Sequence, residues 1–170
     1  MKKILLTQGK CAIVDDADYE WLNQWKWCIQ PNHGTIYVIR NERRKGRRVT
    51  VRMHREILGI EHGDKAQVDH IDGNGINNQR HNLRKCSHQQ NSFNKKKRKK
   101  TTSQYHGVHQ FRNTVNRKTY KYWRAAIRVN GKPIFLGQFP TELLAAKAYD
   151  KAAEKYFGEF ANLNIYRRFK

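Results

Sequence analysis

The sequence predicts an α+β protein built from several small modules, and three features support this prediction. Lys45-Gly46 and Asn130-Gly131 each separate two runs of strand-forming residues, a pattern typical of β-hairpins. Between these two hairpins, residues 64–97 favour the order strand, loop, strand and helix. Helix-forming residues then fill positions 141–157. Antiparallel strands covered by a single helix make a small α+β unit.

The charge of the chain is strongly positive and unevenly distributed. Its 170 residues include 35 Lys and Arg against 14 Asp and Glu, a formal net charge of +21. Residues 73–141 contain 16 Lys or Arg and no acidic residue, whereas a surface that needs only solubility mixes both signs. We therefore expect nucleic acid as the partner, and the motifs of residues 64–164 narrow this expectation to double-stranded DNA. An anionic membrane is the alternative, but the sequence has no apolar run long enough to span or anchor.

The cysteines and the first residues indicate the compartment. Cys11, Cys28 and Cys86 are odd in number and form no Cys-x-x-Cys pair, which disfavours a disulfide framework or a structural zinc site. The apolar start of the chain stops at Thr7, too early for the hydrophobic part of a signal peptide. We expect buried reduced thiols in a soluble protein of the cytoplasm of a bacterium or phage-infected cell.

Residues 1–63 are expected to form a small module of helices and one β-hairpin. Asp15 and Asp16 precede a short amphipathic helix and suit its dipole. The tryptophans nearby are expected in the core, because aromatic residues dominate small cores. The other expected elements are a strand at 27–30, hairpin strands at 36–43 and 47–53, and a helix at 53–58.

The expected hairpin of this first module is rich in arginine. We expect these arginines to contact DNA, although a solvated edge strand is an alternative explanation. The residues are Arg40, Arg43, Arg44, Arg47 and Arg48.

Residues 64–97 carry the residue types that phosphodiester hydrolysis needs. His70 can accept a proton near neutral pH, and Asp69 and Asn91 offer oxygen ligands to a divalent cation. Asn82 can accept the other imidazole N–H of His70 and fix its tautomer, as a carboxylate does in hydrolytic triads. Taken singly, each could instead be a core histidine, a turn cap or an exposed helical residue.

The run from Asp69 to Asn74, followed by Asn82-Leu83-Arg84 and Asn91, resembles the HNH family of ββα-metal nucleases. It is most similar to phage and intron-encoded homing endonucleases, which have Asn at the last motif position. The resemblance implies that Asp69 and Asn91 bind one metal, that His70 is the general base, and that Asn82 orients it. An amide oxygen ligand favours Mg²⁺ or Mn²⁺ over Zn²⁺. His54 also matches a recurring family feature, with a structural or phosphate-contacting role.

Six consecutive positive residues lead from this segment into a linker predicted at 98–103. Such a run does not fold alone, and we expect it to lie along phosphates or, alternatively, to be a plain spacer. The residues are Lys95, Lys96, Lys97, Arg98, Lys99 and Lys100.

Residues 104–164 predict three strands, at 105–111, 122–129 and 133–139, and a helix whose apolar stripe is Leu144, Ala148, Ala152 and Tyr156. The Tyr105-His106-Gly107-Val108 motif and the helix sequence resemble the apetala-two DNA-binding domain, which lays its sheet in the major groove. The DNA-facing positions implied by the family include Gly107, Phe111 and Phe135, the last being equally compatible with core packing. The cationic or imidazole residues expected to contact DNA are His106, His109, Arg112, Arg124 and Arg128.

Together these features predict a site-directed DNA endonuclease of the homing, nicking type, of phage or mobile-element origin. Because the modules differ and only one catalytic set is present, we expect a monomer on a long asymmetric site. A DNA-binding regulator with an inactive nuclease fold is the first alternative, and an RNA-binding module the second.

Overall fold

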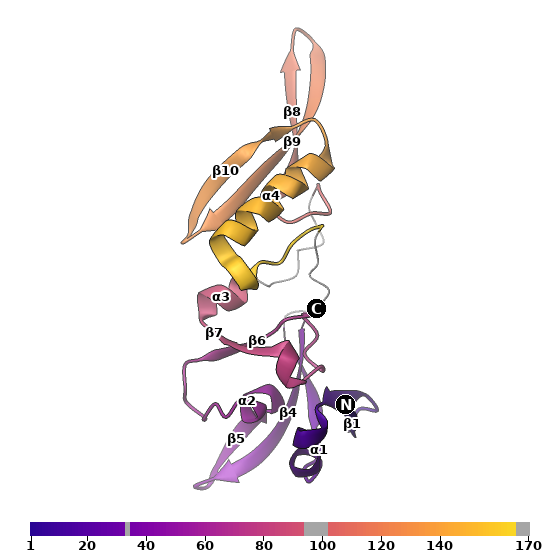
Figure 1. Ribbon diagram of the computed structural model, residues 1–170, viewed down its shortest axis with the longest axis vertical. Coiled ribbons are helices and arrows are strands. Elements are labelled where there is room, and N and C mark those ends of the chain that lie inside the picture. The colour runs from indigo at the N-terminus through magenta and orange to yellow at the C-terminus, as the bar shows by residue number, and fades with distance from the viewer. Residues whose placement is uncertain (33–34, 94–101, 166–170) are drawn as a thin grey trace. The chain divides into compact units, whose positions relative to one another are not determined.

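The computed structural model describes residues 1–32, 35–93 and 102–165. It contains two compact units, Met1–Ser92 and Phe93–Lys170, which are described separately (Figure 1). Helices and antiparallel sheets occur in both, consistent with the predicted α+β class. The lysine-rich run at 95–100 lies outside the described residues.

The first unit contains three small antiparallel sheets, three short α-helices and one 3₁₀ helix, η1, in its described residues. The predicted arginine-rich hairpin and the predicted strand–loop–strand–helix segment are both present. Two strands at the beginning of the chain, β1 and β2, were not predicted. The elements are β1 (Lys2–Leu5), β2 (Cys11–Val14), α1 (Asp16–Leu22), β3 (Cys28–Asn32), β4 (Thr35–Arg44), β5 (Arg47–Arg52), α2 (Met53–Ile57), β6 (Gln67–His70), η1 (Arg80–Asn82), β7 (Leu83–Cys86) and α3 (His88–Phe93).

One hydrophobic core runs through this whole unit. Trp27, Leu22 and Met53 are fully buried, and Val68 and Leu83 of the β6–β7 hairpin belong to the same cluster. The expected boundary at residue 63 therefore falls inside a single compact unit. Trp27 is a core residue, as predicted, whereas Trp25 is exposed over about half of its surface.

Two sets of contacts tie the loop of residues 71–82 to the start of the chain. Ile13 N–H donates to Ile76 O at 2.9 Å, and Asn78 N–H donates to Ile13 O at 2.7 Å. Arg80 donates to the buried Asp18 carboxylate at 2.7 and 2.8 Å. The N-terminal strands and helix are thus part of the support for this loop.

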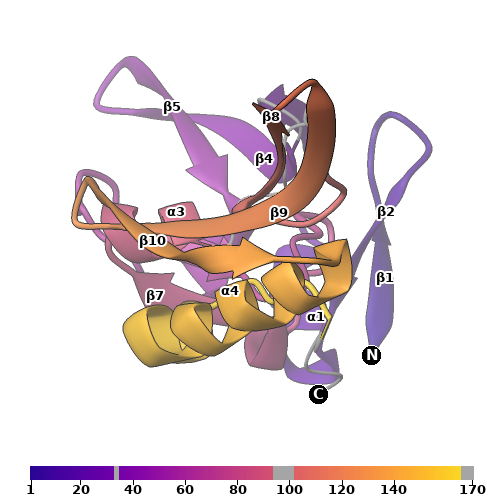
Figure 2. The ribbon, with the colours of Figure 1, turned by 90° about the horizontal axis from the view of Figure 1, so that it is seen from above.

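The second unit is a three-stranded antiparallel sheet in the order β10-β9-β8, covered on one face by a helix, as predicted. Figure 2 shows α4 lying along one side of this sheet. Thr141 caps the helix by accepting from Leu144 N–H at 3.3 Å. The elements are β8 (Val108–Val115), β9 (Lys118–Val129), β10 (Lys132–Phe139), α4 (Glu142–Phe157) and η2 (Gly158–Phe160).

The predicted apolar stripe of α4 was partly wrong. Leu144 and Tyr156 are exposed, while the helix buries Ala145, Ala146 and Ala153 against the sheet. Small side chains allow the helix to approach the strands closely, so the buried face is displaced from the larger residues. Asp150 is also buried, and its carboxylate accepts from the backbone N–H groups of residues 164 and 165.

The β8–β9 hairpin is longer than predicted. The expected loop at 112–121 is instead a continuation of both strands, closed by Asn116 and Arg117 at positive φ angles of 48° and 60°.

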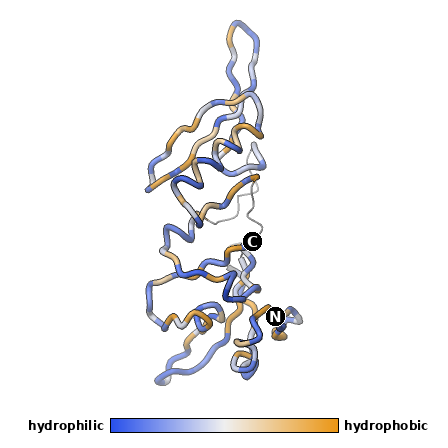
Figure 3. The backbone as a smooth tube through the Cα atoms, viewed as in Figure 1, coloured by the Kyte–Doolittle hydropathy of each residue, from blue (hydrophilic) through white to orange (hydrophobic). Residues whose placement is uncertain are grey.

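Figure 3 shows that hydrophilic residues dominate the end of the β4–β5 hairpin in the first unit. No helix among the described residues is both long and apolar enough to cross a membrane.

Candidate active site

The predicted strand–loop–strand–helix segment is formed by β6, β7 and α3. In the β6–β7 register, Asp69 lies opposite Arg84 and His70 opposite Leu83. Ser87 and Gln90 make reciprocal bonds at the start of α3: Gln90 N–H donates to Ser87 Oγ at 3.2 Å, and Ser87 N–H donates to Gln90 Oε1 at 2.8 Å. This capping box fixes where the helix leaves the hairpin.

Asn82 closes the loop of residues 71–82. Its Oδ1 accepts from Asp72 N–H at 3.0 Å, and its Nδ2 donates to Asp72 Oδ1 at 3.0 Å and Asn77 O at 2.8 Å. These bonds use both amide hydrogens of Asn82. Its predicted role is therefore corrected: Asn82 positions the loop that carries other site residues, because its amide is engaged by the loop and not by the His70 ring.

His70 is held by a residue to which the sequence analysis gave no role. The imidazole is 5% exposed, and its Nε2 lies 3.5 Å from Oδ1 of the fully buried Asn78. A carboxamide oxygen only accepts hydrogen bonds, so this contact requires the tautomer that carries its hydrogen on Nε2. Asn78 is positioned in turn by its backbone bond to Ile13 and by donation from Nδ2 to Gly75 O at 3.4 Å.

The surroundings of His70 favour its neutral form. Burial lowers the pKa of His70 below its usual value, while the hydrogen bond with Asn78 and the carboxylates of Asp72 and Asp69 partly oppose this shift. A neutral imidazole at neutral pH is the form that accepts a proton. The electrostatics of the site therefore suit a general base.

Two aromatic residues pack around His70. The His54 ring on α2 meets the His70 ring edge-on at a centroid distance of 5.1 Å, and the Tyr37 ring lies 5.2 Å from His54 and 6.2 Å from His70. His54 is 4% exposed, and burial lowers its pKa well below the usual value, with smaller lowering contributions from His70, Arg52 and Arg55. Of the two roles expected for His54, burial favours the structural one over phosphate contact.

The two predicted metal ligands lie on elements that meet at β6. Asn91 on α3 donates from Nδ2 to Gln67 Oε1 at 2.7 Å, and Gln67 is two residues before Asp69 on the same strand face. This bond turns the Asn91 nitrogen toward Gln67, so the side-chain oxygen is the atom that could bind a cation. A carboxylate and an amide oxygen suit a hard divalent ion such as Mg²⁺ or Mn²⁺.

The carboxylate of Asp69 forms an ion pair with Arg84. Its Nη2 and Nε donate to Asp69 Oδ2 at 2.6 and 2.9 Å, and Asp69 is 5% exposed. Within the described ranges, no three or more His, Cys, Asp or Glu side chains are grouped to hold a metal.

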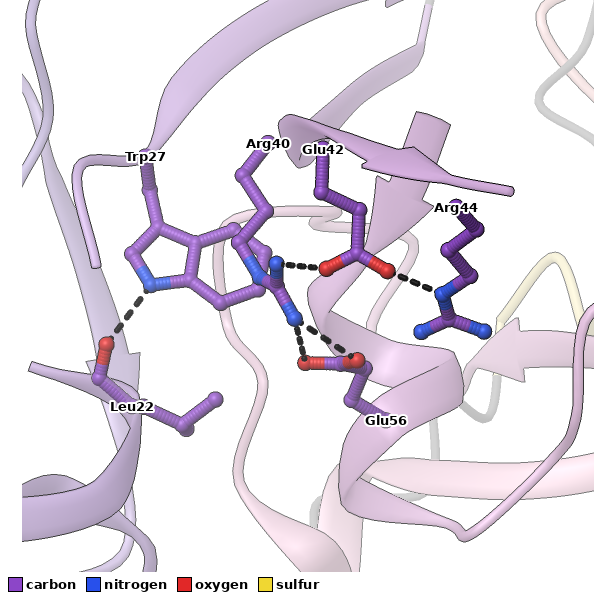
Figure 4. Close-up of polar contacts among 6 residues, drawn as sticks. All are labelled: Leu22, Trp27, Arg40, Glu42, Arg44 and Glu56. Carbon is purple, nitrogen blue, oxygen red and sulfur yellow. Dashed lines mark hydrogen bonds and ion pairs between the residues drawn. The ribbon is translucent and has the colours of Figure 1, made fainter. Parts of the chain in front are cut away.

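Arg40, predicted to contact DNA, belongs instead to the interior of the first unit (Figure 4). It is 7% exposed, pairs with Glu42 and Glu56, and places its guanidinium over the rings of Trp25 and Trp27 at 4.4 and 5.4 Å. This prediction was wrong because two carboxylates and two indole rings surround the side chain. Burial raises the pKa of Glu42, but its bonds to Arg40 and Arg44 outweigh burial and lower it.

The other arginines of this hairpin remain available to a ligand. Arg43 pairs with Arg48 across the strands, and Arg44 with Arg47, so the charges occupy both faces of the hairpin end. All four are exposed, although Arg44 also forms an ion pair with Glu42.

In the second unit, two positions implied by the family resemblance serve the fold. His106 N–H donates to Asn164 Oδ1 at 2.6 Å, and its ring stacks at 6.5 Å from Tyr149. Gly107 has φ +66°, and a Cβ there would lie 2.1 Å from the Tyr149 ring. These contacts give His106 and Gly107 a role in packing beside α4, while Gly107 stays exposed and its contact with DNA stays a prediction.

The other positions expected to contact DNA lie on the sheet face opposite α4, which we call the open face. Its residues are His109, Phe111, Arg124, Arg128 and Phe135. In the strand register His109 pairs with Arg124, and Phe135 with Ala126, while Arg128 follows on the same side of β9. Arg124 stacks on Phe111 at 3.3 Å and donates to Gln138 Oε1 at 3.4 Å. Phe135 is 63% exposed, so it belongs to this surface and not to the core. The expected contact Arg112 lies beyond it, on the extended hairpin.

The chain is similar to proteins of two kinds. It is 42% identical over 97 residues, 57% of its length, to an uncharacterised HNH endonuclease of Acanthamoeba polyphaga mimivirus, of which the match covers 46%. It is 43% identical over 53 residues, 30% of its length, to dehydration-responsive element-binding protein 2A of Oryza sativa, covering 19% of that protein. It is 41% identical over 64 residues, 38% of its length, to an AP2-like ethylene-responsive transcription factor of Arabidopsis thaliana, covering 12%.

The chain thus spans less than half the length of each of these relatives. No family model matches it. No solved structure matches it either. The similarities support a nuclease segment combined with an AP2-like DNA-binding segment.

Proposed function

We propose that this protein is a metal-dependent DNA endonuclease of the HNH type. The observation that carries the proposal is the arrangement around β6. There, His70 is held by Asn78 at Nε2 next to Asp69, and Asn91 is joined to the same strand through Gln67. The similarity to a viral HNH endonuclease supports the same reaction class.

The residues divide the work of phosphodiester hydrolysis. His70 accepts a proton from the attacking water, and the contact of its Nε2 with Asn78 holds the ring in place. Asn82 holds the loop that carries Asn78, and thereby keeps the His70 ring oriented. Asp69 and Asn91 are the residues that would hold one Mg²⁺ or Mn²⁺, which when bound stabilises charge on the phosphate and the leaving oxygen. Arg84 orients the Asp69 carboxylate.

The DNA-binding surfaces of the two units differ, and this supports an asymmetric site. The first unit offers the arginines at the end of the β4–β5 hairpin, and the second offers the open face with Arg124 and Arg128. With one His70 per chain, a single bound molecule attacks one strand in one pose. We therefore propose a homing-type nicking enzyme that acts as a monomer on a long site.

The test is plasmid nicking by the full chain with Mg²⁺ or Mn²⁺. His70→Ala should lower the rate by roughly 10² to 10⁴ without weakening DNA binding, since a general base contributes about this much. His81→Ala is the matched control, because His81 lies in the same loop region but is exposed. Full activity of His70→Ala, or equal losses in both variants, would refute the assignment. Chelation by EDTA should stop nicking in the wild type.

A DNA-binding regulator is the second candidate, supported by the similarity to plant transcription factors. It predicts tight duplex binding with no cleavage under any divalent metal. Competition between duplex DNA and RNA of equal length separates both candidates from an RNA-binding protein.

A further inference from the structure

The β8–β9 hairpin extends beyond the part of the sheet that α4 covers. From Arg112 opposite Lys121 to Val115 opposite Lys118, it continues as a two-stranded ribbon that ends at the Asn116-Arg117 turn. We call residues 112–121 the β-arm. Figure 1 shows it projecting past the end of α4 within the second unit.

The β-arm has no hydrophobic core of its own. Every one of its residues is exposed, and none belongs to the two apolar clusters of this unit. An isolated two-stranded hairpin is marginally stable in water. The arm is supported by local features instead: two turn residues at positive φ, a hydroxyl contact between Thr114 and Thr119 at 3.1 Å, and continuity with the sheet.

The charge of the β-arm is entirely positive. It carries Arg112, Arg117, Lys118 and Lys121, and the acid-free stretch of residues 73–141 surrounds it in sequence. In the described parts of the chain, none of the ion pairs involves these four side chains. The arm therefore presents cations that the unit itself does not neutralise.

These cations lie on both faces of the ribbon. Arg112 and Lys121 form one cross-strand pair on one face. Lys118, two residues before Tyr120 in β9, lies with it on the opposite face. A flat surface would meet only one of the two faces. A groove walled by phosphates on both sides would meet both, and the major groove of duplex DNA, about 12 Å wide, admits a two-stranded ribbon.

We propose that the β-arm lies in a groove of duplex DNA and contacts phosphates beyond the footprint of the open face. Four residues in each strand, at about 3.3 Å per residue, give the arm a reach of roughly 13 Å. It lengthens the contacted tract without reading bases, because its charges suit phosphates. The inference rests on the proposed DNA binding but not on catalysis.

The test compares two triple variants of the full chain with equal charge changes in the same unit. The first replaces Arg112, Lys118 and Lys121 with Gln in the β-arm. The control replaces Lys147, Lys151 and Lys155 with Gln; these residues are exposed on α4, on the other side of the sheet. Binding to a 40-base-pair duplex of random sequence is measured by fluorescence anisotropy in EDTA, over a range of salt.

We expect the arm variant to bind at least about tenfold more weakly near 0.1 M salt, while its log–log salt slope becomes shallower by about 2.7, at about 0.9 per lost phosphate contact. The control should stay close to wild type. Equal slopes for the two variants would overturn the proposal. If the wild type itself fails to bind duplex DNA, the proposed function fails, and this outcome is distinct from failure of the arm alone.

Lysine acylation of the wild-type chain gives a measurement that needs no variant. Duplex DNA should protect Lys118 and Lys121 from an amine-reactive reagent but leave Lys147 and Lys151 reactive. Equal reactivity of Lys118 and Lys121 with and without duplex would refute the contact. Protection by structured RNA but not by DNA would refute the choice of partner.

Discussion

The molecule has two hairpins with clustered positive charge, and they use that charge differently. In β4–β5 of the first unit, Arg40 is enclosed by Glu42 and Glu56, and Arg44 is paired with Glu42. The β-arm of the second unit has no acidic residue in its sequence. Nearby carboxylates therefore decide whether an arginine serves the fold or faces a ligand. Arginine density alone does not distinguish the two cases.

The largest effect expected from this comparison is on stability. Arg40→Met should destabilise the first unit by about 3–5 kcal/mol, because removing one partner of a buried ion pair leaves uncompensated charge. Arg48→Met, on the exposed end of the same hairpin, should change stability by no more than about 0.5 kcal/mol. Urea unfolding followed by tryptophan fluorescence measures both. Equal midpoints would show that Arg40 is not a structural residue.

Short sequence patterns correctly predicted the helices, turns and hairpins whose formation depends mainly on residues adjacent in sequence. The helix expected at 141–157 and the Asn130-Gly131 turn were both predicted from short-range patterns, and both are present. The same holds for the hairpin that carries Asp69 and His70. The Asn130-Gly131 turn and the start of α4 are each determined within a few residues of chain.

Contacts between residues far apart in sequence explain why the roles of Asn82 and Arg40 were predicted wrongly. The sequence offers several asparagines between positions 74 and 91, and the one facing His70 is selected by the bond from Asn78 N–H to Ile13 O. The burial of Arg40 similarly depends on Glu56, which α2 brings to the hairpin. Neither partner is near in sequence, so no local pattern distinguishes Asn78 from Asn82 or Arg40 from Arg43.

The two units also differ in their histidines, because the first unit buries His54 and His70. This burial should make the stability of the first unit depend on pH. In the first unit, the pKa of His54 is depressed well below its usual value by burial. As pH falls below about 6.5, the unfolded chain binds a proton that the folded unit does not, so stability falls by up to about 1.4 kcal/mol per pH unit and per histidine. This loss continues until pH reaches the depressed pKa of the folded state.

His54→Phe tests this assignment, because it keeps an aromatic ring beside His70 and removes the titrating group. Between pH 6.5 and pH 5.5, its free energy of unfolding should fall less steeply than that of the wild type. His81→Phe, at an exposed position, is the control and should keep the wild-type slope. Identical slopes for wild type and His54→Phe would mean that His54 does not contribute to the pH dependence.

The smallest expected effect separates two neighbouring arginines at the end of β4–β5. Arg43 and Arg44 are both exposed, but only Arg44 is bonded to a carboxylate, that of Glu42. If charge facing DNA is what matters, Arg43→Gln should make the log–log salt slope of duplex binding shallower by about 0.9, the value of one phosphate contact. Arg44→Gln should change it by less, because Glu42 already neutralises part of that charge. Anisotropy titrations with a 40-base-pair duplex between 50 and 200 mM salt resolve this difference. Equal changes for the two variants would show that the ion pair with Glu42 opens when DNA binds, and that carboxylates govern only the buried part of the hairpin.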